Sequence, residues 1–242
     1  MKQSMFTIES NVALTPQVWQ MRLRGDTGAI TRPGQFVNLW LEGMFLRRPI
    51  SVYDWDGEGL DIVYKVVGRG TAAMAGLRPG AALDLLTGLG NGYDLHRAGA
   101  RPLLLGGGVG VPPLYGLAKR LKDCRPVAVL GFNTAAEVFG AAAFEALGVE
   151  TVVCTADGSA GVRGFVTDAL PADYSYFYAC GPEPMLRAVC RATATSGQLS
   201  FEERMGCGFG ACMGCSCRTL TGNKRICREG PVLEKEEIQW PD

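Results

Sequence analysis

Residues 102–113, with the sequence PLLLGGGVGVPP, contain the features that decide the fold of this chain. The apolar residues 102–105 predict a short buried strand, and the glycines after them predict a tight loop. Proline is favoured in the first turn of a helix, and the apolar residues that follow recur at the spacing of one helix face: Leu114, Leu117, Ala118 and Leu121. A strand, a glycine loop and a helix in this order predict the start of a nucleotide-binding α/β unit.

The chain beyond this unit alternates between predicted strands and predicted helices. Strands are expected at 127–132, 151–154 and 174–179, and helices at 135–147 and 183–195. Such alternation predicts a parallel sheet that binds ligands at the carboxyl ends of its strands. Cys180, Gly181 and Pro182 directly follow the last of these strands.

The glycine loop differs from the Rossmann fingerprint. A G-x-G-x-x-G pattern would require a glycine where Pro113 stands, and Asn133 occupies the position of the acid that usually ends the next strand. The glycines could therefore also be plain turn residues. No basic cluster follows Phe132, which favours NAD over NADP.

Residues 1–97 predict a β-structure. Short runs of strand-forming residues occur at 6–12, 18–23, 35–41, 50–53 and 60–67, separated by Gly, Pro, Asp and Asn. The sequence DGEG at 56–59 indicates a hairpin turn. Strands at this spacing, without a long helical pattern, predict a small antiparallel β-barrel.

Two motifs in this half are candidate phosphate sites. The sequence RPIS at 48–51 opens a strand with an arginine, a rigid residue and a hydroxyl. Later, GRGT at 68–71 leads into a predicted helix at 72–77, and a glycine loop before a helix offers free N–H groups to an anion. Each motif has an ordinary alternative, because Arg-Pro is common at strand starts and the glycine-threonine pattern could be a turn with a helix cap.

Residues 205–227 have the cysteine spacing of a plant-type [2Fe–2S] cluster. Cys207, Cys212 and Cys215 form a C-x4-C-x2-C pattern, and Cys227 follows after a short spacer. The glycines between the first three allow the backbone to wrap closely and to point N–H groups at cluster sulfurs. Cys217 breaks the register and is interpreted as a spare cysteine rather than a ligand.

Two other sites, a zinc knuckle and a disulfide knot, are alternatives for these cysteines, as are free thiols without a ligand. A zinc knuckle also uses C-x2-C, although zinc sites usually contain two such pairs. A disulfide knot would require an oxidising compartment, and the opening MKQSMFTIES does not have the pattern of a signal peptide. The remaining cysteines are isolated, as expected in a reducing cytoplasm: Cys124, Cys154, Cys180 and Cys190.

The composition excludes several functions. Lys plus Arg and Asp plus Glu number 24 each, so no net charge would attract nucleic acid or an anionic membrane. No apolar run approaches the roughly 18 residues of a membrane span. The single histidine, His96, excludes a mechanism that requires a histidine pair. We expect three domains in the 242 residues: a β-barrel at 1–97, an α/β domain at 98–200 and a cluster domain at 201–242.

In combination, the motifs resemble the ferredoxin-NADP⁺ reductase superfamily. In chain order they are RPIS, YKVVGRGT, GGGVGVPP and CGPEPM. The C-terminal ERMGCGFGACMGCSC with its later cysteine resembles one branch, the electron-transfer subunits of NAD-linked (type B) dihydroorotate dehydrogenases. The resemblance covers essentially the whole chain, and residues 203–232 are its most specific part.

The resemblance implies three cofactor sites. The residues implied for FAD are Arg48, Pro49, Ile50, Ser51, Val63, Tyr64, Lys65, Gly70 and Thr71. Those implied for NAD are Gly107, Gly108, Gly110, Gly181 and Pro182, with Cys180 as the candidate catalytic residue beside the nicotinamide. The alternative interpretation of Cys180 is a buried thiol at a strand end. The implied [2Fe–2S] ligands are Cys207, Cys212, Cys215 and Cys227.

The resemblance also implies a function as an electron relay. A nicotinamide transfers two electrons as hydride, an iron–sulfur centre transfers one at a time, and a flavin between them converts one to the other. No residue set resembles a pyrimidine site, so a catalytic partner is expected. By resemblance this partner carries FMN and oxidises dihydroorotate to orotate for pyrimidine biosynthesis, in a cytoplasmic heterotetramer with two copies of each chain. Phe209 and Met213 mark the candidate docking face.

Two other functions remain compatible with the sequence. The first is a flavin and iron–sulfur subunit of a bifurcating ferredoxin:NADP⁺ oxidoreductase or of a sulfhydrogenase, although such subunits are usually longer. The second, which is not an enzyme, is a zinc-stabilised nucleotide-binding regulator.

Overall fold

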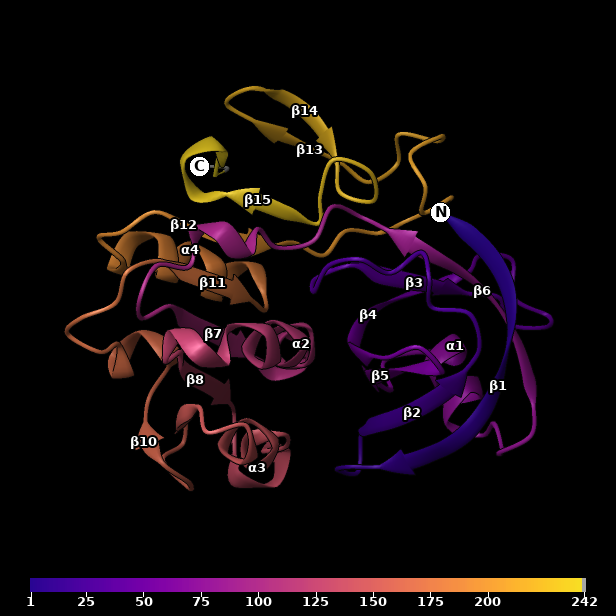
Figure 1. Ribbon diagram of the computed structural model, residues 1–242, viewed down its shortest axis with the longest axis horizontal. Helices are drawn as coiled ribbons and strands as arrows, with labels where there is room; N and C mark the ends of the chain where they lie inside the picture. The colour runs from indigo at the N-terminus through magenta and orange to yellow at the C-terminus, as the bar shows by residue number, and fades with distance from the viewer. Residues whose placement is uncertain (241–242) are drawn as a thin grey trace.

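Two β-structures lie side by side, and the C-terminal segment covers one end of both. The computed structural model describes residues 1–240. Figure 1 shows a barrel on the right, which contains the N-terminus, and a sheet with helices on the left. The expected fold class, a β-barrel followed by a parallel-sheet unit and a cluster-binding segment, is confirmed.

The barrel is closed and antiparallel, with the strand order β1-β2-β5-β4-β3-β6. Its strands are β1 (Lys2–Ala13), β2 (Val18–Arg24), β3 (Phe36–Leu39), β4 (Arg48–Trp55), β5 (Gly59–Lys65) and β6 (Ala82–Leu89). Helix α1 (Arg69–Ala75) follows β5 and starts three residues earlier than the sequence indicates. Alternate side chains such as Ile62 and Tyr64 fill the barrel core, as expected from the two-residue period of a strand.

Strand β6 is the barrel strand that the sequence pattern missed. Its two faces are both largely buried, so its apolar residues do not alternate cleanly with polar ones. Leu83 and Leu85 point into the barrel, whereas Leu86 and Leu89 pack against the C-terminal segment. A strand covered on both faces lacks the alternation by which half-buried strands are recognised.

The second unit is a sheet of seven strands in the order β10-β9-β8-β7-β11-β12-β15. The parallel strands are β7 (Leu103–Gly107), β8 (Val127–Phe132), β9 (Glu150–Thr155), β10 (Val162–Arg163), β11 (Phe177–Cys180) and β12 (Gly197–Ser200). Helices α2 (Pro112–Leu121) and α3 (Ala141–Ala146) pack on one face, and α4 (Glu183–Ala192) packs on the other. Helices on both faces are typical of a parallel sheet.

The helix expected at 135–147 is interrupted. A 3-10 turn spans Ala135–Glu137, and α3 begins only after Gly140, whose φ of 78° is left-handed. A left-handed residue cannot continue a right-handed helix, so a glycine at this position divides the predicted element.

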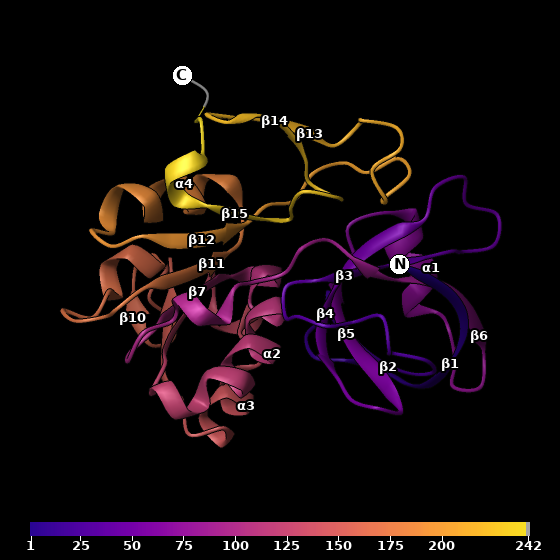
Figure 2. The same cartoon turned by 45° about the horizontal axis from the view of Figure 1, so that its top comes forward.

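The C-terminal segment is attached to both units. The hairpin of β13 (Ser216–Thr219) and β14 (Gly222–Arg225) is followed by β15 (Val232–Glu234), which pairs antiparallel with β12 at the sheet edge. On the other side, Cys215 and Ile226 pack against Phe36 of the barrel. Figure 2 shows this segment, in yellow and orange, extending from the sheet to the barrel.

Helix α2 joins the sheet to strand β4 of the barrel. The rings of Tyr115 and Tyr53 stack with centroids 4.3 Å apart and planes inclined by 7°. The Arg120 guanidinium lies 3.6 Å above the Trp55 ring, and Lys119 forms an ion pair with Asp54 at 2.6 Å. Aromatic stacking and a cation–π contact therefore hold β4 against the nucleotide-binding unit.

Within residues 1–240, no helix is both long enough and apolar enough to cross a membrane.

Replacing Tyr115 with alanine should destabilise the folded chain by about 2–3 kcal/mol, because the stack on Tyr53 and the edge contact with Phe144 are both lost. Urea unfolding measures this change. Tyr115→Phe keeps the ring and should stay within about 0.5 kcal/mol of the parent chain. An unchanged unfolding midpoint in Tyr115→Ala would show that the stack does not hold the two units together.

Candidate functional site

The residues implied for FAD lie where strands β4 and β5 separate. The two strands pair from Trp55 and Leu60 as far as Val52 and Ile62. Beyond that point, residues 48–51 pair only with β3, and residues 63–65 pair only with β2, among the described residues 1–240. The facing edges of β4 and β5 therefore offer main-chain N–H and C=O groups to a ligand.

Arg48 and Gly70 meet at this opening. A Cβ atom at Gly70 would lie 2.0 Å from Nε of Arg48, so a side chain at this position would displace the guanidinium. The Thr71 side chain stabilises the turn before α1, because its Oγ1 accepts hydrogen bonds from the N–H groups of Val67 (2.9 Å) and Gly68 (3.2 Å). The two candidate phosphate motifs thus form one site, and an arginine beside a glycine main chain fits a phosphate group of FAD.

The other residues implied for FAD have different surroundings. The Tyr64 side chain is buried in the barrel, and its hydroxyl hydrogen-bonds with Asn11 Oδ1 at 2.9 Å, so a contact to FAD would have to use its main chain. Val63 points the other way, into the core that the barrel shares with the sheet. Pro49, Ile50, Ser51 and Lys65 are partly exposed around the opening.

The glycine loop and the segment 180–182 lie together at the carboxyl edge of the sheet. Their strands, β7 and β11, are neighbours, with Gly106 paired to Cys180. A Cβ atom on Gly110 would lie 2.1 Å from the Cys180 carbonyl oxygen, so glycine is required for this approach. Gly107 and Gly181 pack against Met185, and Pro182 is the N-cap residue directly before helix α4.

Gly108 leaves the outer side of this loop open. Its φ is 53°, and a Cβ atom built on it would meet no atom within 4 Å. Because no side chain covers the loop there, its main chain remains accessible to a dinucleotide pyrophosphate.

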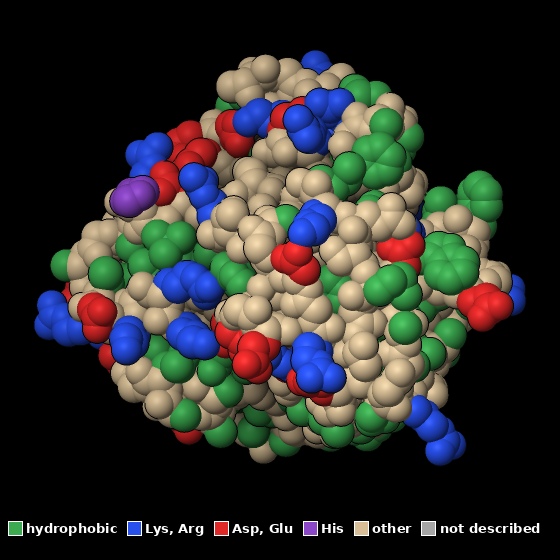
Figure 3. All heavy atoms as spheres, turned by 45° about the vertical axis from the view of Figure 1, so that its right-hand side comes forward, with side chains coloured by type: hydrophobic (Ala, Val, Ile, Leu, Met, Phe, Trp, Pro, Cys, Tyr) green, Lys and Arg blue, Asp and Glu red, His purple; other side chains and the backbone are tan. Residues whose placement is uncertain are grey.

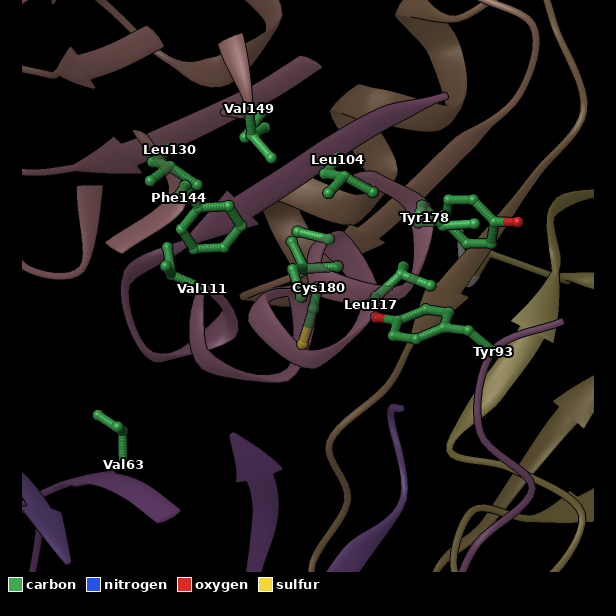
Figure 4. Packing of buried hydrophobic residues seen from close by; sticks show 14 of the residues in the cluster. Val63, Tyr93, Leu104, Val111, Leu117, Leu130, Phe144, Val149, Tyr178 and Cys180 are labelled. Carbon is green, nitrogen blue, oxygen red and sulfur yellow. The ribbon is translucent and has the colours of Figure 1, made fainter. Parts of the chain in front are cut away.

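Cys180 is buried at the end of β11, with 3% of its surface exposed. Burial raises the pKa of its thiol to about 12. In Figure 4 its sulfur points away from the sheet, toward the side on which Val63 of the barrel lies. At neutral pH Cys180 is therefore an uncharged thiol, which can shape a nicotinamide site but cannot act there as a nucleophile.

The four cysteines implied for the cluster form two pairs. Cys207 N–H donates to Cys212 Sγ at 3.4 Å, and Cys227 N–H donates to Cys215 Sγ at 3.4 Å. No group of three or more His, Cys, Asp and Glu side chains in residues 1–240 is arranged for a single metal ion. Two pairs of thiolates suit a [2Fe–2S] cluster, in which each of the two irons takes two protein ligands.

The backbone around Cys207 favours its thiolate form. Ala211 N–H lies 3.2 Å from Cys207 Sγ, and Phe209 N–H lies 3.5 Å from it. Burial alone would raise the pKa of Cys207, but these donors lower it to about 6. N–H groups directed at sulfur stabilise the charge of a coordinated thiolate, so this loop fits an iron–sulfur cluster.

Cys217 lies outside these two pairs. It is on β13 and lines a separate cavity of about 470 Å³ together with Phe201, Thr219 and Trp240. Its interpretation as a spare cysteine therefore remains compatible with the structure.

Two asparagines that hold the C-terminal segment on the barrel were missed in the sequence. Asn38 Nδ2 donates to the Cys207 carbonyl at 3.3 Å, and Asn91 Nδ2 donates to the Val232 carbonyl at 2.7 Å. The available signal for Asn38 was a polar residue inside the apolar run 36–41. A buried amide in such a run requires a hydrogen-bond partner, and the sequence does not identify it.

Comparison with known proteins connects this geometry to a family. Residues 202–239 match the family model described as the iron-sulfur cluster binding domain of dihydroorotate dehydrogenase B. Two relatives are named dihydroorotate dehydrogenase B (NAD(+)), electron transfer subunit. The one from Fusobacterium nucleatum is 41% identical, over 96% of this chain and 97% of the relative. The one from Bacillus caldolyticus is 43% identical, over 96% of each chain.

Solved structures agree with this relationship. An NADH-dependent reduced ferredoxin-NADP oxidoreductase matches with a TM-score of 0.88 and 29% identity, over 98% of this chain and 90% of the other. A ferredoxin NADP⁺ reductase from Neisseria gonorrhoeae matches with a TM-score of 0.69 and 17% identity, over 79% of this chain and 90% of the other. The second likeness concerns the fold alone.

Gly70→Ala should weaken FAD binding by about 10–100-fold, because the new methyl group displaces the Arg48 guanidinium and a charged hydrogen bond to phosphate is lost. Flavin content and the FAD dissociation constant of the purified chain measure the change. Gly76→Ala is the matched control, since Gly76 ends the same helix with a φ of −82° and its Cβ would make only an ordinary contact at 3.5 Å. Equal FAD affinity in the two variants would contradict the role of Arg48.

Proposed function

This chain belongs to the family of dihydroorotate dehydrogenase B electron transfer subunits, and we propose that it carries electrons between NAD and a partner flavoprotein through FAD and a [2Fe–2S] cluster. The proposal concerns the residues that hold each cofactor, the identity of the partner and the surface that receives it.

The observation that carries the proposal is the central position of β4. Its first half forms one side of the opening at which Arg48 meets Gly70. Its second half packs on α2, which directly follows the glycine loop. Its neighbour β3 contacts the Cys207 loop through Asn38. Strand β4 and its neighbour β3 therefore adjoin all three candidate cofactor sites.

Each site supplies a distinct chemical environment. NAD exchanges hydride, FAD converts this two-electron exchange to single electrons, and the cluster carries one electron at a time. Arg48 provides positive charge for a phosphate, and the uncharged Cys180 thiol adds no charge beside the nicotinamide. Main-chain N–H groups at Cys207 and Cys212 offset the negative charge of the sulfurs.

The partner that we propose is an FMN-containing flavoprotein that oxidises dihydroorotate to orotate in pyrimidine biosynthesis. Relatives of this chain are named electron transfer subunits of dihydroorotate dehydrogenase B, and a subunit with that name implies a catalytic partner. We propose a heterotetramer of two chains of each kind, working in the cytoplasm, where isolated thiols such as Cys124 and Cys190 stay reduced.

The docking face that we propose surrounds the cluster loop. Phe209 and Met213 of this loop are 40% and 54% exposed. Trp40 and Phe45, which follow β3, are 46% and 99% exposed, and Asn38 of β3 contacts Cys207 of the cluster loop. Figure 3 shows several exposed hydrophobic side chains at the upper right of the molecule, separated by other side chains and backbone. Exposed apolar side chains that surround a redox centre suit a protein partner.

The alternative functions are less well supported. The match to the NADH-dependent reduced ferredoxin-NADP oxidoreductase favours a bifurcating subunit as the second candidate, but its identity of 29% is lower than that of the relatives named above. The zinc-stabilised regulator is contradicted by the iron–sulfur family match over residues 202–239.

Replacing Cys212 with serine should affect only one of the two steps of the relay, which are flavin reduction by NADH and electron delivery to the partner. Reduction of the flavin by NADH should continue, because the FAD and NAD sites are outside the cluster loop, whereas electron delivery to the partner should stop. Visible spectra of the anaerobic protein before and after NADH, together with turnover by the complex, measure both steps. Cys217→Ser is the matched control and should retain both. Loss of flavin reduction in Cys212→Ser would contradict separate sites.

Phe209→Glu combined with Met213→Glu should abolish co-purification with the dihydroorotate-oxidising partner, because charge in an apolar interface must be desolvated without a counter-charge. Size-exclusion chromatography of the co-expressed chains measures assembly. Leu220→Glu is the control, since Leu220 is an exposed apolar residue at the turn of the β13–β14 hairpin. A complex that survives the double substitution would place the docking face elsewhere.

A further inference from the structure

We infer that Asn38 is the positioning residue that fixes the cluster loop, residues 205–215, against the strand that carries the flavin-binding motif. The inference rests on the proposed function, since it concerns how the FAD and cluster sites are kept at one separation. None of the sequence motifs includes Asn38.

Asn38 lies between the two sites in the fold. It is in β3, where its register partner in β4 is Pro49 of the RPIS motif. Its neighbours Val37 and Leu39 point into the barrel core, so the Asn38 side chain points out of the barrel. The cluster loop covers it there, and only 1% of its surface is exposed. Register partners in antiparallel strands are about 4.5–5.5 Å apart, so this contact adjoins the flavin strand directly.

The cluster loop is shaped for this contact. Asn38 Nδ2 donates to the carbonyl of Cys207, the first cluster ligand, at 3.3 Å. The next residue, Gly208, has a φ of 78°, and a Cβ atom on it would lie 2.3 Å from Nδ2 of Asn38. A side chain at Gly208 would therefore displace the amide from the loop. The contact therefore requires Asn38 in β3 and Gly208 in the cluster loop.

The two polar atoms of the Asn38 side chain have different surroundings. Its Oδ1 is buried and has no hydrogen-bond partner among residues 1–240. A buried unpaired acceptor destabilises a fold, and an apolar residue of similar size would avoid this cost. The useful part of the side chain is therefore its N–H donor, which is directed at the cluster loop.

The main chain of Asn38 is itself held in place. Arg47 Nη1 donates to the Asn38 carbonyl at 3.2 Å, and Arg47 also forms an ion pair with Asp84 of β6 at 3.0 Å. These contacts hold Asn38 in the barrel. Its side-chain hydrogen bond therefore restricts the movement of Cys207. Oxidation of NADH yields NAD⁺, a proton and two electrons, and the two electrons reach the cluster one at a time. The distance between the FAD site and the cluster site therefore governs both transfers.

The test uses the cofactor-loaded chain with Asn38→Leu and Asn38→Ala. Leucine keeps the size and branching of asparagine but has no N–H donor. Both variants should raise amide hydrogen exchange and iron loss to a chelator for the loop 205–215. After mixing with NADH, flavin reduction should be unchanged, whereas cluster reduction should slow by about 10-fold, as for other residues that support a metal ligand.

Asn91→Ala is the matched control. Asn91 holds the same C-terminal segment, because its amide donates to the carbonyls of Glu229 (2.9 Å) and Val232 (2.7 Å), but it lies after β6 and has no register partner in the RPIS motif. Asn91→Ala should raise exchange around residues 229–232 and leave cluster reduction at the parent rate. Equal slowing in Asn91→Ala and the Asn38 variants would overturn the specific role of Asn38.

Failure of this inference can be distinguished from failure of the proposed function. Parent-like loop exchange and cluster reduction in both Asn38 variants would overturn the inference while leaving the relay intact. A parent chain whose cluster is not reduced by NADH would overturn the relay, and the exchange and chelation measurements would still decide the role of Asn38. Loss of the cluster from both variants with normal flavin content would support it, because the barrel would then be folded and only the loop released.

Discussion

The separation of strands β4 and β5 is the constraint on which the rest of this structure depends. The two strands pair only as far as Val52 and Ile62, and beyond that point each follows its other neighbour. Hydrogen-bonding groups on the two open edges need a partner, and the partner that we propose is the flavin. The paired half of β4 carries the aromatic residues that pack on α2. The opening and the contact between the barrel and the sheet unit are therefore both formed by β4.

A glycine stands at a close approach in each of the three sites. Gly70 admits the Arg48 guanidinium, Gly110 admits the Cys180 carbonyl, and Gly208 admits the Asn38 amide. In each case a Cβ atom would overlap a group that comes from a distant part of the chain. The glycines therefore allow residues of different motifs to come into contact. Glycine is needed at these positions for the close approach, and not only for the flexibility of its own loop.

The electrostatic environments of the sites differ according to their chemistry. Burial keeps Cys180 uncharged, whereas main-chain donors favour the thiolate of Cys207, although both are cysteines of one small protein. The difference arises because Cys180 ends a strand inside a packed core, and Cys207 lies in a loop whose N–H groups are not used by secondary structure. Desolvation and hydrogen bonding thus act in opposite directions on the same side-chain type.

The sequence by itself determined most of the barrel strands, the glycine loop with its helix and the cysteine motif, together with the chemistry that these motifs carry. Local signals are enough to recognise the strand, glycine loop and helix at 102–121, the barrel strands β1 to β5 and the cysteine spacing of residues 207–227. Only the tertiary structure decided that Tyr64 points into the barrel, that β15 completes the sheet and that Asn38 meets Cys207. Periodicity and spacing report on residues close along the chain, whereas these contacts join residues 32 to 169 positions apart. Their partners are set by the packing of the whole fold, so no local pattern contains them.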